Sequence, residues 1–150
     1  KMKKIILTLS FLLLVSCGYQ PIFSSKTSNF LIEEIIHDRN DKISSKIKND
    51  LNYLSKAENY TKVIKLKLNS EKKIGISSKD SKGDPLVYKM TIITSIEIYS
   101  NNEVVRKKNI SKNFSYKNTE NKFDLKQYEK TIENNLVESI KENIILILYN

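Results

Sequence analysis

The chain has 150 residues, of which 26 are basic and 17 acidic, and a formal net charge of +9. It contains one cysteine and one histidine, which excludes a disulfide within the chain and, in practice, a histidine-based metal site. With three glycines and two prolines it offers no glycine-rich loop for a phosphate, and its length suits a single domain with one modest core.

The first sixteen residues have the layout of a secretory signal peptide. Lysines at positions 1, 3 and 4 precede an apolar run from Ile5 to Val15, and the small residue Ser16 follows. The apolar run is shorter than the roughly 18 to 20 residues that a membrane-spanning helix needs. The sequence therefore favours a cleaved signal over a transmembrane anchor.

Cys17 follows the small residue directly, so the segment from Leu14 to Cys17 resembles the lipobox of bacterial lipoproteins. The resemblance implies cleavage between Ser16 and Cys17, a diacylglyceryl group on the Cys17 thiol, and acylation of the new amino terminus by a fatty acid such as palmitate. The alternative is a plain secretory signal whose cysteine is incidental.

Removal of residues 1–16 takes away three basic and no acidic residues, which leaves a mature chain with a net charge of +6. Residues 17–29 combine the lipidated end with a Ser/Thr/Asn-rich stretch and are interpreted as a tether. Residues 30–150 are expected to form one α/β domain.

The first half of this domain predicts one strand and one helix. Phe30 to Ile36 is apolar-rich and short enough for a strand, and Asp38 to Asp41 offers several helix N-caps. Apolar residues then recur at spacings of four, four and three, which is the pattern of one helix face: Ile43, Ile47, Leu51 and Leu54.

Three strands and a helix are predicted next. The strands cover Ile64–Leu68, Leu86–Tyr99 and Val104–Tyr116, with turns at Gly83–Pro85 and Ser100–Asn102. The last strand alternates poorly, so a bulge or a sheet edge is expected there. Asp124 and Gln127 resemble a capping box that opens the final helix. Its apolar face is predicted to contain Leu125, Tyr128, Ile132, Leu136, Ile140, Ile144 and Ile147.

The element order β-α-β-β-β-α predicts an α+β fold in which two helices pack on one face of a four-stranded mixed sheet. The other sheet face is rich in lysine, serine and threonine and should be wet. No catalytic set stands out, because His37 and Asp38 lack an identifiable nucleophile and no acidic residues have metal-ligand spacing. We therefore expect a non-enzyme without metal or cofactor beyond the lipid on Cys17.

The basic residues form the one candidate binding surface. An exported chain with few aromatic residues among its lysines is a poor nucleic-acid binder, so anionic lipid or glycan is the expected ligand. The candidates, chosen from their positions, are Lys72, Lys73, Arg106, Lys107 and Lys108.

The segment Cys17 to Phe23 reads Cys-Gly-Tyr-Gln-Pro-Ile-Phe and is close to the opening Cys-Gly-Phe/Tyr-x-Pro-Leu-Tyr of LptE lipoproteins, particularly the alphaproteobacterial members. Ser115-Tyr116 before a long helix near Asp124, and the order of elements, also resemble that family. Gly18 replaces the aspartate that retains many lipoproteins in the inner membrane, which agrees with an outer-membrane address.

The resemblance implies a non-catalytic, lipid-anchored protein on the periplasmic side of the outer membrane or within a barrel lumen. Its expected partners are an LptD-like β-barrel, for which it acts as plug and folding partner, and lipopolysaccharide, bound through basic residues. The alternative is a free-standing periplasm-facing lipoprotein that binds a lipid or an envelope partner without a barrel.

Overall fold

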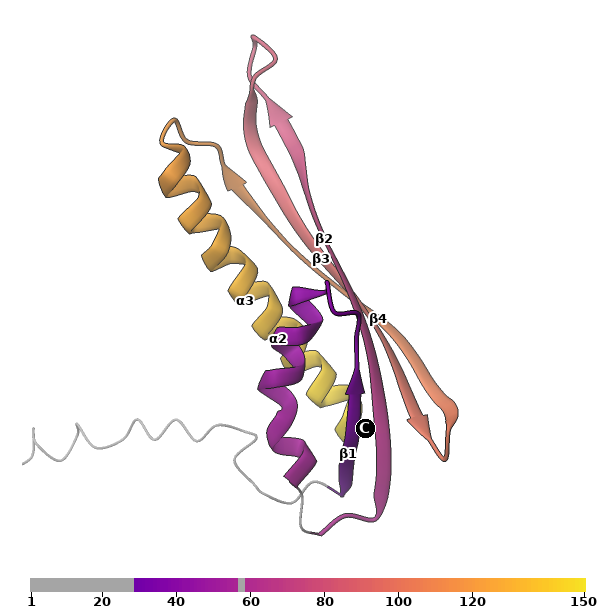
Figure 1. The fold of residues 1–150 in the computed structure, drawn as a ribbon. Coiled ribbons are helices and arrows are strands. Elements are labelled where there is room, and N and C mark those ends of the chain that lie inside the picture. The colour runs from indigo at the N-terminus through magenta and orange to yellow at the C-terminus, as the bar shows by residue number, and fades with distance from the viewer. Residues whose placement is uncertain (1–28, 57–58) are drawn as a thin grey trace, which may run out of the picture.

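The computed structural model describes residues 29–56 and 59–150. The predicted signal, the cleavage site at Ser16 and the lipidated Cys17 lie outside the described residues. The chain forms an α+β fold, as predicted from the sequence (Figure 1). In chain order its elements are β1 (Phe30–Ile36), α2 (Lys42–Leu51), the 3-10 helix η2 (Asn52–Lys56), β2 (Lys62–Lys79), β3 (Pro85–Ser100), β4 (Glu103–Lys117) and α3 (Lys122–Tyr149).

The four strands form one sheet in the order β1-β2-β3-β4. The sheet is mixed, because β1 runs parallel to β2 whereas the other two pairs are antiparallel. Both helices lie on one side of this strongly twisted sheet (Figure 1). We call the helix-covered side the inner face and the opposite side the outer face.

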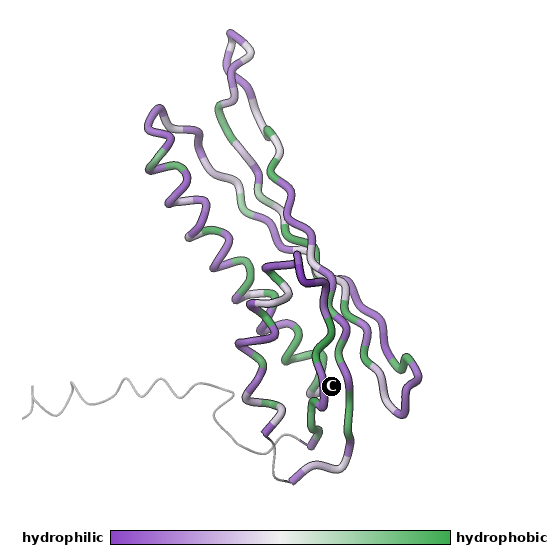
Figure 2. Tube along the Cα trace, in the orientation of Figure 1, coloured by the Kyte–Doolittle hydropathy of each residue, from purple (hydrophilic) through white to green (hydrophobic). Residues whose placement is uncertain are grey.

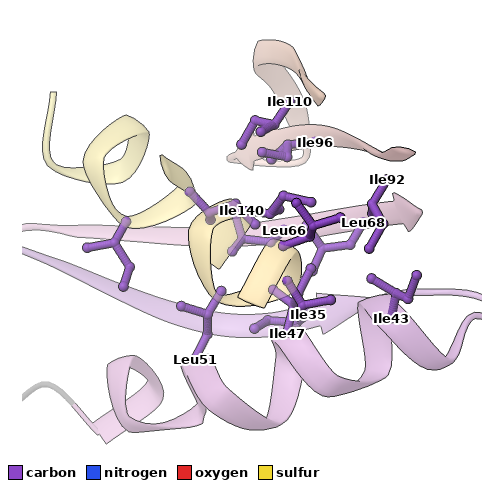
Figure 3. Close-up of a cluster of buried hydrophobic side chains, with 14 of the residues drawn as sticks. Ile35, Ile43, Ile47, Leu51, Leu66, Leu68, Ile92, Ile96, Ile110 and Ile140 are labelled. Carbon is purple, nitrogen blue, oxygen red and sulfur yellow. The ribbon is translucent and has the colours of Figure 1, made fainter. Parts of the chain in front are cut away.

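The core lies between the inner face and the two helices. The predicted face of α2 is confirmed, since Ile43, Ile47 and Leu51 are buried and Leu54 in η2 is buried with them. They meet alternate residues of the strands, such as Leu66 and Ile96, and α3 contributes Ile140 (Figure 3). Each such side chain contributes about 1.5–3 kcal/mol when it is fully buried.

A polar link ties α2 to the sheet within this core. The carboxylate of Asp41 accepts hydrogen bonds from the Ser44 backbone N–H at 2.8 Å and from the Ser70 backbone N–H at 2.7 Å. The Ser70 hydroxyl lies 2.8 Å from the Ser44 hydroxyl and 2.9 Å from that of Thr94. Because the Ser44 and Thr94 side chains are fully buried, this chain of hydroxyls satisfies polar groups that water cannot reach.

Strand β2 is much longer than the sequence indicated. Only Ile64–Leu68 was predicted, whereas β2 pairs with β3 from Lys65 to Lys79. Every residue from Glu71 to Lys79 is exposed, so the sequence of this half of the strand lacks the alternation of buried and exposed residues that would have predicted it. Its end is a tight turn in which the Asp80 carboxylate accepts from the Lys82 and Asp84 backbone N–H groups at 2.9 Å each, and Gly83 takes a φ of 89°.

Two details of the second half differ from the prediction. Helix α3 begins at Lys122, and its N-cap is Asn121, whose side chain accepts from the backbone N–H groups of Phe123 and Asp124. Asp124, the predicted cap, instead accepts from the Asn121 side-chain amide at 2.7 Å. Although α3 has 28 residues, neither it nor another helix of the described part is apolar enough over a sufficient length to span a membrane.

The expectation of a bulge or a sheet edge at the last strand is confirmed, because both are present. β4 is an edge of the sheet, and its pairing with β3 shifts beside Tyr99, where Val105 is left out of the register. The first strand contains an irregularity that was not predicted, because the register with β2 shifts between Ile32 and Glu34. Before the shift the even-numbered Phe30 and Ile32 are buried, and after it the odd-numbered Ile35 is buried.

Candidate functional site

The described domain begins beside the end of its last helix. The ring centroids of Phe30 and Tyr149 are 5.2 Å apart in an edge-to-face arrangement. A cavity of about 490 Å³ opens at this end, with Lys62 and Arg106 in its wall. The predicted lipid tether, residues 17–29, therefore joins the domain at the end formed by β1 and the C-terminus of α3.

The five basic candidate residues do not form one surface. Side chains alternate along a strand, and the strand pairing places Lys72, Arg106 and Lys108 on the inner face but Lys73 and Lys107 on the outer face. The pair on β2 also lies four to seven residues, or roughly 13–23 Å, along the sheet from the group on β4. The five candidates therefore lie on both faces of the sheet, and the single basic surface that the sequence suggested is not formed by them.

Most of these cations have a partner within the domain. Lys72 Nζ lies 2.6 Å from Glu133 Oε2 on α3, and Lys73 Nζ lies 3.0 Å from Glu71. Arg106 Nη1 donates to the Ile147 carbonyl oxygen at 2.8 Å and so holds the end of α3 against β4. No carboxylate of the described residues lies within ion-pair distance of Lys108.

Lys107 forms an ion pair with Glu97 on the outer face. Its Nζ lies 2.6 Å from Glu97 Oε1, Lys67 lies 3.8 Å from the other carboxylate oxygen, and the Tyr99 hydroxyl donates to that oxygen at 2.7 Å. Hydrogen bonds from Lys107 and then from Tyr99 hold the pKa of Glu97 below its usual value. The same bond raises the pKa of Lys107, which keeps this part of the outer face an internally neutralised, polar surface.

Three exposed apolar side chains lie on the inner face toward the tip of the β2–β3 hairpin. Ile74 pairs with Met90, which pairs with Phe114, and Ile76 belongs to the next row. Met90 is buried, so Ile74 and Ile76 on β2 and Phe114 on β4 lie on either side of it. The N-terminal end of α2 lies opposite Ser70 of β2, so these rows lie beyond that helix. Figure 2 colours several positions of this hairpin as apolar. Ile74, Ile76 and Phe114 are 44%, 49% and 46% exposed, and we call these three residues the distal apolar surface.

Sequence reasoning missed this surface, although a signal for it exists. Ile74 and Ile76 continue the even-numbered register of Leu66 and Leu68, but the polar Ser70 and Lys72 interrupt it. A strand extended to Lys79 would have placed both isoleucines on the inner face.

Two cations border the distal apolar surface. Lys72 and Lys112 both pair with Ile92, one from each neighbouring strand, so they flank it on the inner face. No carboxylate of the described residues lies within ion-pair distance of Lys112. Cations next to exposed apolar side chains suit an amphiphile whose anionic group lies beside its hydrocarbon part.

The described residues offer little for catalysis. His37 Nδ1 lies 2.7 Å from the Asp38 backbone oxygen, whereas the Asp38 carboxylate accepts from the Asn40 backbone N–H. The two side chains therefore do not form a base and its orienting carboxylate. No group of three His, Cys, Asp or Glu residues in the described part could hold a metal ion.

The domain is a two-helix, mixed-sheet α+β unit with a polar outer face and an apolar, cation-bordered distal end. No protein-family model and no curated protein matches the sequence. Rare lipoprotein B from Shewanella oneidensis shares the fold with a TM-score of 0.61 at 12% identity, over 80% of this chain and 93% of that one.

Two further solved structures agree with this likeness. Uncharacterized lipoprotein B from Nitrosomonas europaea has a TM-score of 0.61 at 10% identity, over 85% of this chain and 87% of its own. A minor lipoprotein from Acinetobacter baumannii has a TM-score of 0.56 at 10% identity, over 79% and 88%. At such identities the comparison shows the fold, and that fold is one that bacterial lipoproteins use.

Proposed function

We propose that this chain is an outer-membrane lipoprotein of the LptE type. In this role it assists lipopolysaccharide assembly at the cell surface as plug and folding partner of an LptD-like β-barrel. The observation that carries the proposal is the fold shared with rare lipoprotein B over 93% of that chain. The lipobox at Ser16–Cys17 and the LptE-like opening from Cys17 to Phe23 support it independently.

The surface of the domain suits a plug. The lumen of a large barrel is polar, so a plug should have a hydrophilic exterior and a hydrophobic core that is buried within its own fold. Most positions on the outer face of the sheet meet this requirement, with Val63, Val87 and Ile93 as apolar exceptions. Its polar side chains include Asn69, Thr91, Ser95, Asn109 and Ser111. No catalytic group is needed for this role.

The distal end is the part that we propose for contact with lipopolysaccharide. This lipid combines phosphate groups with acyl chains, and the distal apolar surface lies beside Lys72 and Lys112. Lys73, Arg106, Lys107 and Lys108 remain candidates for weaker, longer-range attraction of the same anion. The existing ion pairs of Lys72 and Lys107 would have to exchange for contacts with the ligand.

A pulldown of the lipidated full chain from detergent-solubilised outer membrane tests the barrel partner. We expect a large β-barrel protein to co-purify with the chain. Recovery of the chain without any barrel contradicts the plug role and favours a free-standing lipoprotein that binds a lipid or an envelope partner.

A separate titration with purified lipopolysaccharide tests the ligand. Ile74→Glu with Ile76→Glu should weaken binding by about tenfold or more, because the pair loses apolar contacts worth about 1.4 kcal/mol or more. Val104→Glu with Val105→Glu makes the same change at the other end of the sheet, where the two valines are 47% and 60% exposed. Equal weakening by both pairs contradicts a distal site.

The adjacent lysines of β2 give a second matched pair for this titration. Lys72→Gln and Lys73→Gln remove the same charge from opposite faces of one strand. Lys72→Gln should weaken lipopolysaccharide binding clearly more than Lys73→Gln does, and an equal effect of both would mean that net charge alone governs the interaction.

A further inference from the structure

Strand β4 presents an open edge along its whole length. It is the last strand of the sheet and pairs only with β3. Within the described residues, no loop, cap or side-chain hydrogen bond to the β4 backbone supplements this pairing. In an antiparallel ladder every second residue points its N–H and C=O away from the partner strand, so β4 offers a regular row of donors and acceptors.

The edge is also regular enough to template a further strand. Its one irregularity lies at the Val105 end, beside Tyr99. From Arg106 to Lys117 the twelve residues pair with β3 without a shift. Protective edges are usually short or bulged, whereas this stretch is longer than an average strand.

The charge of β4 selects what can pair with it. The strand contains five basic residues and a single acidic one, Glu103, which lies at its start. Of the basic residues only Lys107 is in an ion pair, and no carboxylate of the described part lies within 4.0 Å of Lys108, Lys112 or Lys117. Like charges directly opposite one another destabilise a strand pair, so a second β4 is a poor partner.

We propose that β4 is a docking edge for an extended acidic segment of a partner protein, which adds to the sheet as a fifth strand. Backbone hydrogen bonds would hold the segment, and the carboxylates on one of its faces would meet Lys108 and Lys112, which both lie on the inner face. These two lysines then have two effects, since they repel a second copy of the chain and attract an acidic strand. This inference does not depend on a barrel partner or on lipopolysaccharide binding.

The probe is a synthetic peptide of about nine residues, within the usual length of a strand, that alternates valine with glutamate. Fluorescence anisotropy measures its binding to the purified full chain. Two versions carry N-methyl groups on alternate residues, one version for each parity. Only one parity can face β4, so one N-methylated peptide should bind about tenfold or more weakly while the other binds like the parent.

The protein side of the test uses charge reversal. Lys108→Glu with Lys112→Glu should weaken binding of the parent peptide by about tenfold or more, because two attractive pairs become repulsive. Lys42→Glu with Lys48→Glu is the matched control, since it makes the same change in charge on α2, where both lysines are exposed and make no ion pair with a described residue. Hydrogen exchange should show slower exchange of alternate β4 amides when the parent peptide is bound.

Several results would overturn the inference. One is no binding at about 1 mM peptide, which corresponds to less than about 4 kcal/mol. Another is equal binding of both N-methylated peptides, which would reduce the lysines to a general anion surface. A third is displacement of the parent peptide by anionic lipid vesicles, together with unchanged hydrogen exchange of the β4 amides when the peptide is bound. A fourth is concentration-dependent self-association through the glutamate-bearing β1 edge, which would make a second copy the partner.

Discussion

Asp41 is expected to be the most important single polar residue for the packing of α2 on the sheet. One carboxylate oxygen caps α2 through the Ser44 N–H at 2.8 Å, and the other accepts from the Ser70 N–H at 2.7 Å. The last residue of β2 that pairs with β1 is Lys67, so the Ser70 N–H lies beyond the reach of the neighbouring strand. Asp41 therefore accepts hydrogen bonds from a backbone N–H at the start of a helix and from one at the edge of a strand.

The magnitude follows from these two bonds. Loss of an N-cap costs about 1 kcal/mol. Leaving a partly buried N–H without its acceptor costs about 1–3 kcal/mol. Asp41→Ala should therefore lower the free energy of unfolding by about 2–4 kcal/mol, a large part of the roughly 5–15 kcal/mol that stabilises a typical domain. Asp41→Asn should cost less, because its amide oxygen can still cap the helix.

Asp38→Ala is the matched control, because its carboxylate accepts a single exposed bond from the Asn40 N–H at 2.7 Å. It should cost less than about 1 kcal/mol. The measurement is equilibrium urea unfolding of the mature chain followed by circular dichroism, with hydrogen exchange at the Ser70 amide. If Asp41→Ala costs no more than Asp38→Ala, or the Ser70 amide exchanges at its original rate, the bridging role assigned to Asp41 is refuted.

Three further predictions concern the anchor, a buried tyrosine and the core. Cys17→Ala should move the protein from the membrane to the soluble fraction, and a lipid-bearing variant in the pellet would contradict the lipobox. Burial first, and then the 2.6 Å bond to Glu129, raise the pKa of Tyr116, so Glu129→Gln should lower that pKa in an alkaline absorbance titration. Because the folded pKa lies above the unfolded one, the stabilisation from Tyr116 is complete below about pH 10 and decreases as the pH rises from there through the folded pKa. Ile140→Ala should cost about 2–5 kcal/mol in urea unfolding, whereas the half-exposed Leu146→Ala on the same helix should cost far less.

The parts of the fold that could be predicted are those in which burial imposes a period. The face of α2 is readable because Ile43, Ile47 and Leu51 are all buried at helical spacing. The distal half of β2 is not readable, because no residue from Glu71 to Lys79 is buried. The start of α3 was misplaced because Asn121 and Asp124 are both good caps three residues apart, and only the geometry selects Asn121.

The candidate site was harder to predict than the fold. Arg106, Lys107 and Lys108 are consecutive and therefore appear as one basic cluster, yet a strand sends adjacent side chains to opposite faces. The ion pair between Lys72 and Glu133 joins residues 61 positions apart, and no local pattern reveals it. Cys17 lies outside the described residues, so the lipid anchor stays a prediction from the sequence.

The distal apolar surface has a simple cause in the lengths of the elements. At about 3.3 Å per residue, the 18 residues of β2 extend nearly 60 Å, whereas the 10 residues of α2 rise about 15 Å at 1.5 Å each. The N-terminal end of α2 lies opposite Ser70, so the part of β2 that continues toward the hairpin tip, which projects beyond the helices in Figure 1, is not covered by α2. Ile74 and Ile76 are therefore exposed, although Met90 and Tyr116 on the next two strands are buried at the same level.

The same dimensions relate the two ends of the domain to a membrane. The chain enters at Asn29, beside the C-terminus of α3, and the hairpin tip lies at the other end (Figure 1). Phe30 pairs with Lys62, and Ile74 follows twelve residues later on β2, so about 40 Å separate the start of the domain from the distal apolar surface. This distance is close to the roughly 40–45 Å thickness of a bilayer with its headgroups. Under the proposed function, a lipid anchor in the periplasmic leaflet would therefore place the distal apolar surface near the opposite leaflet.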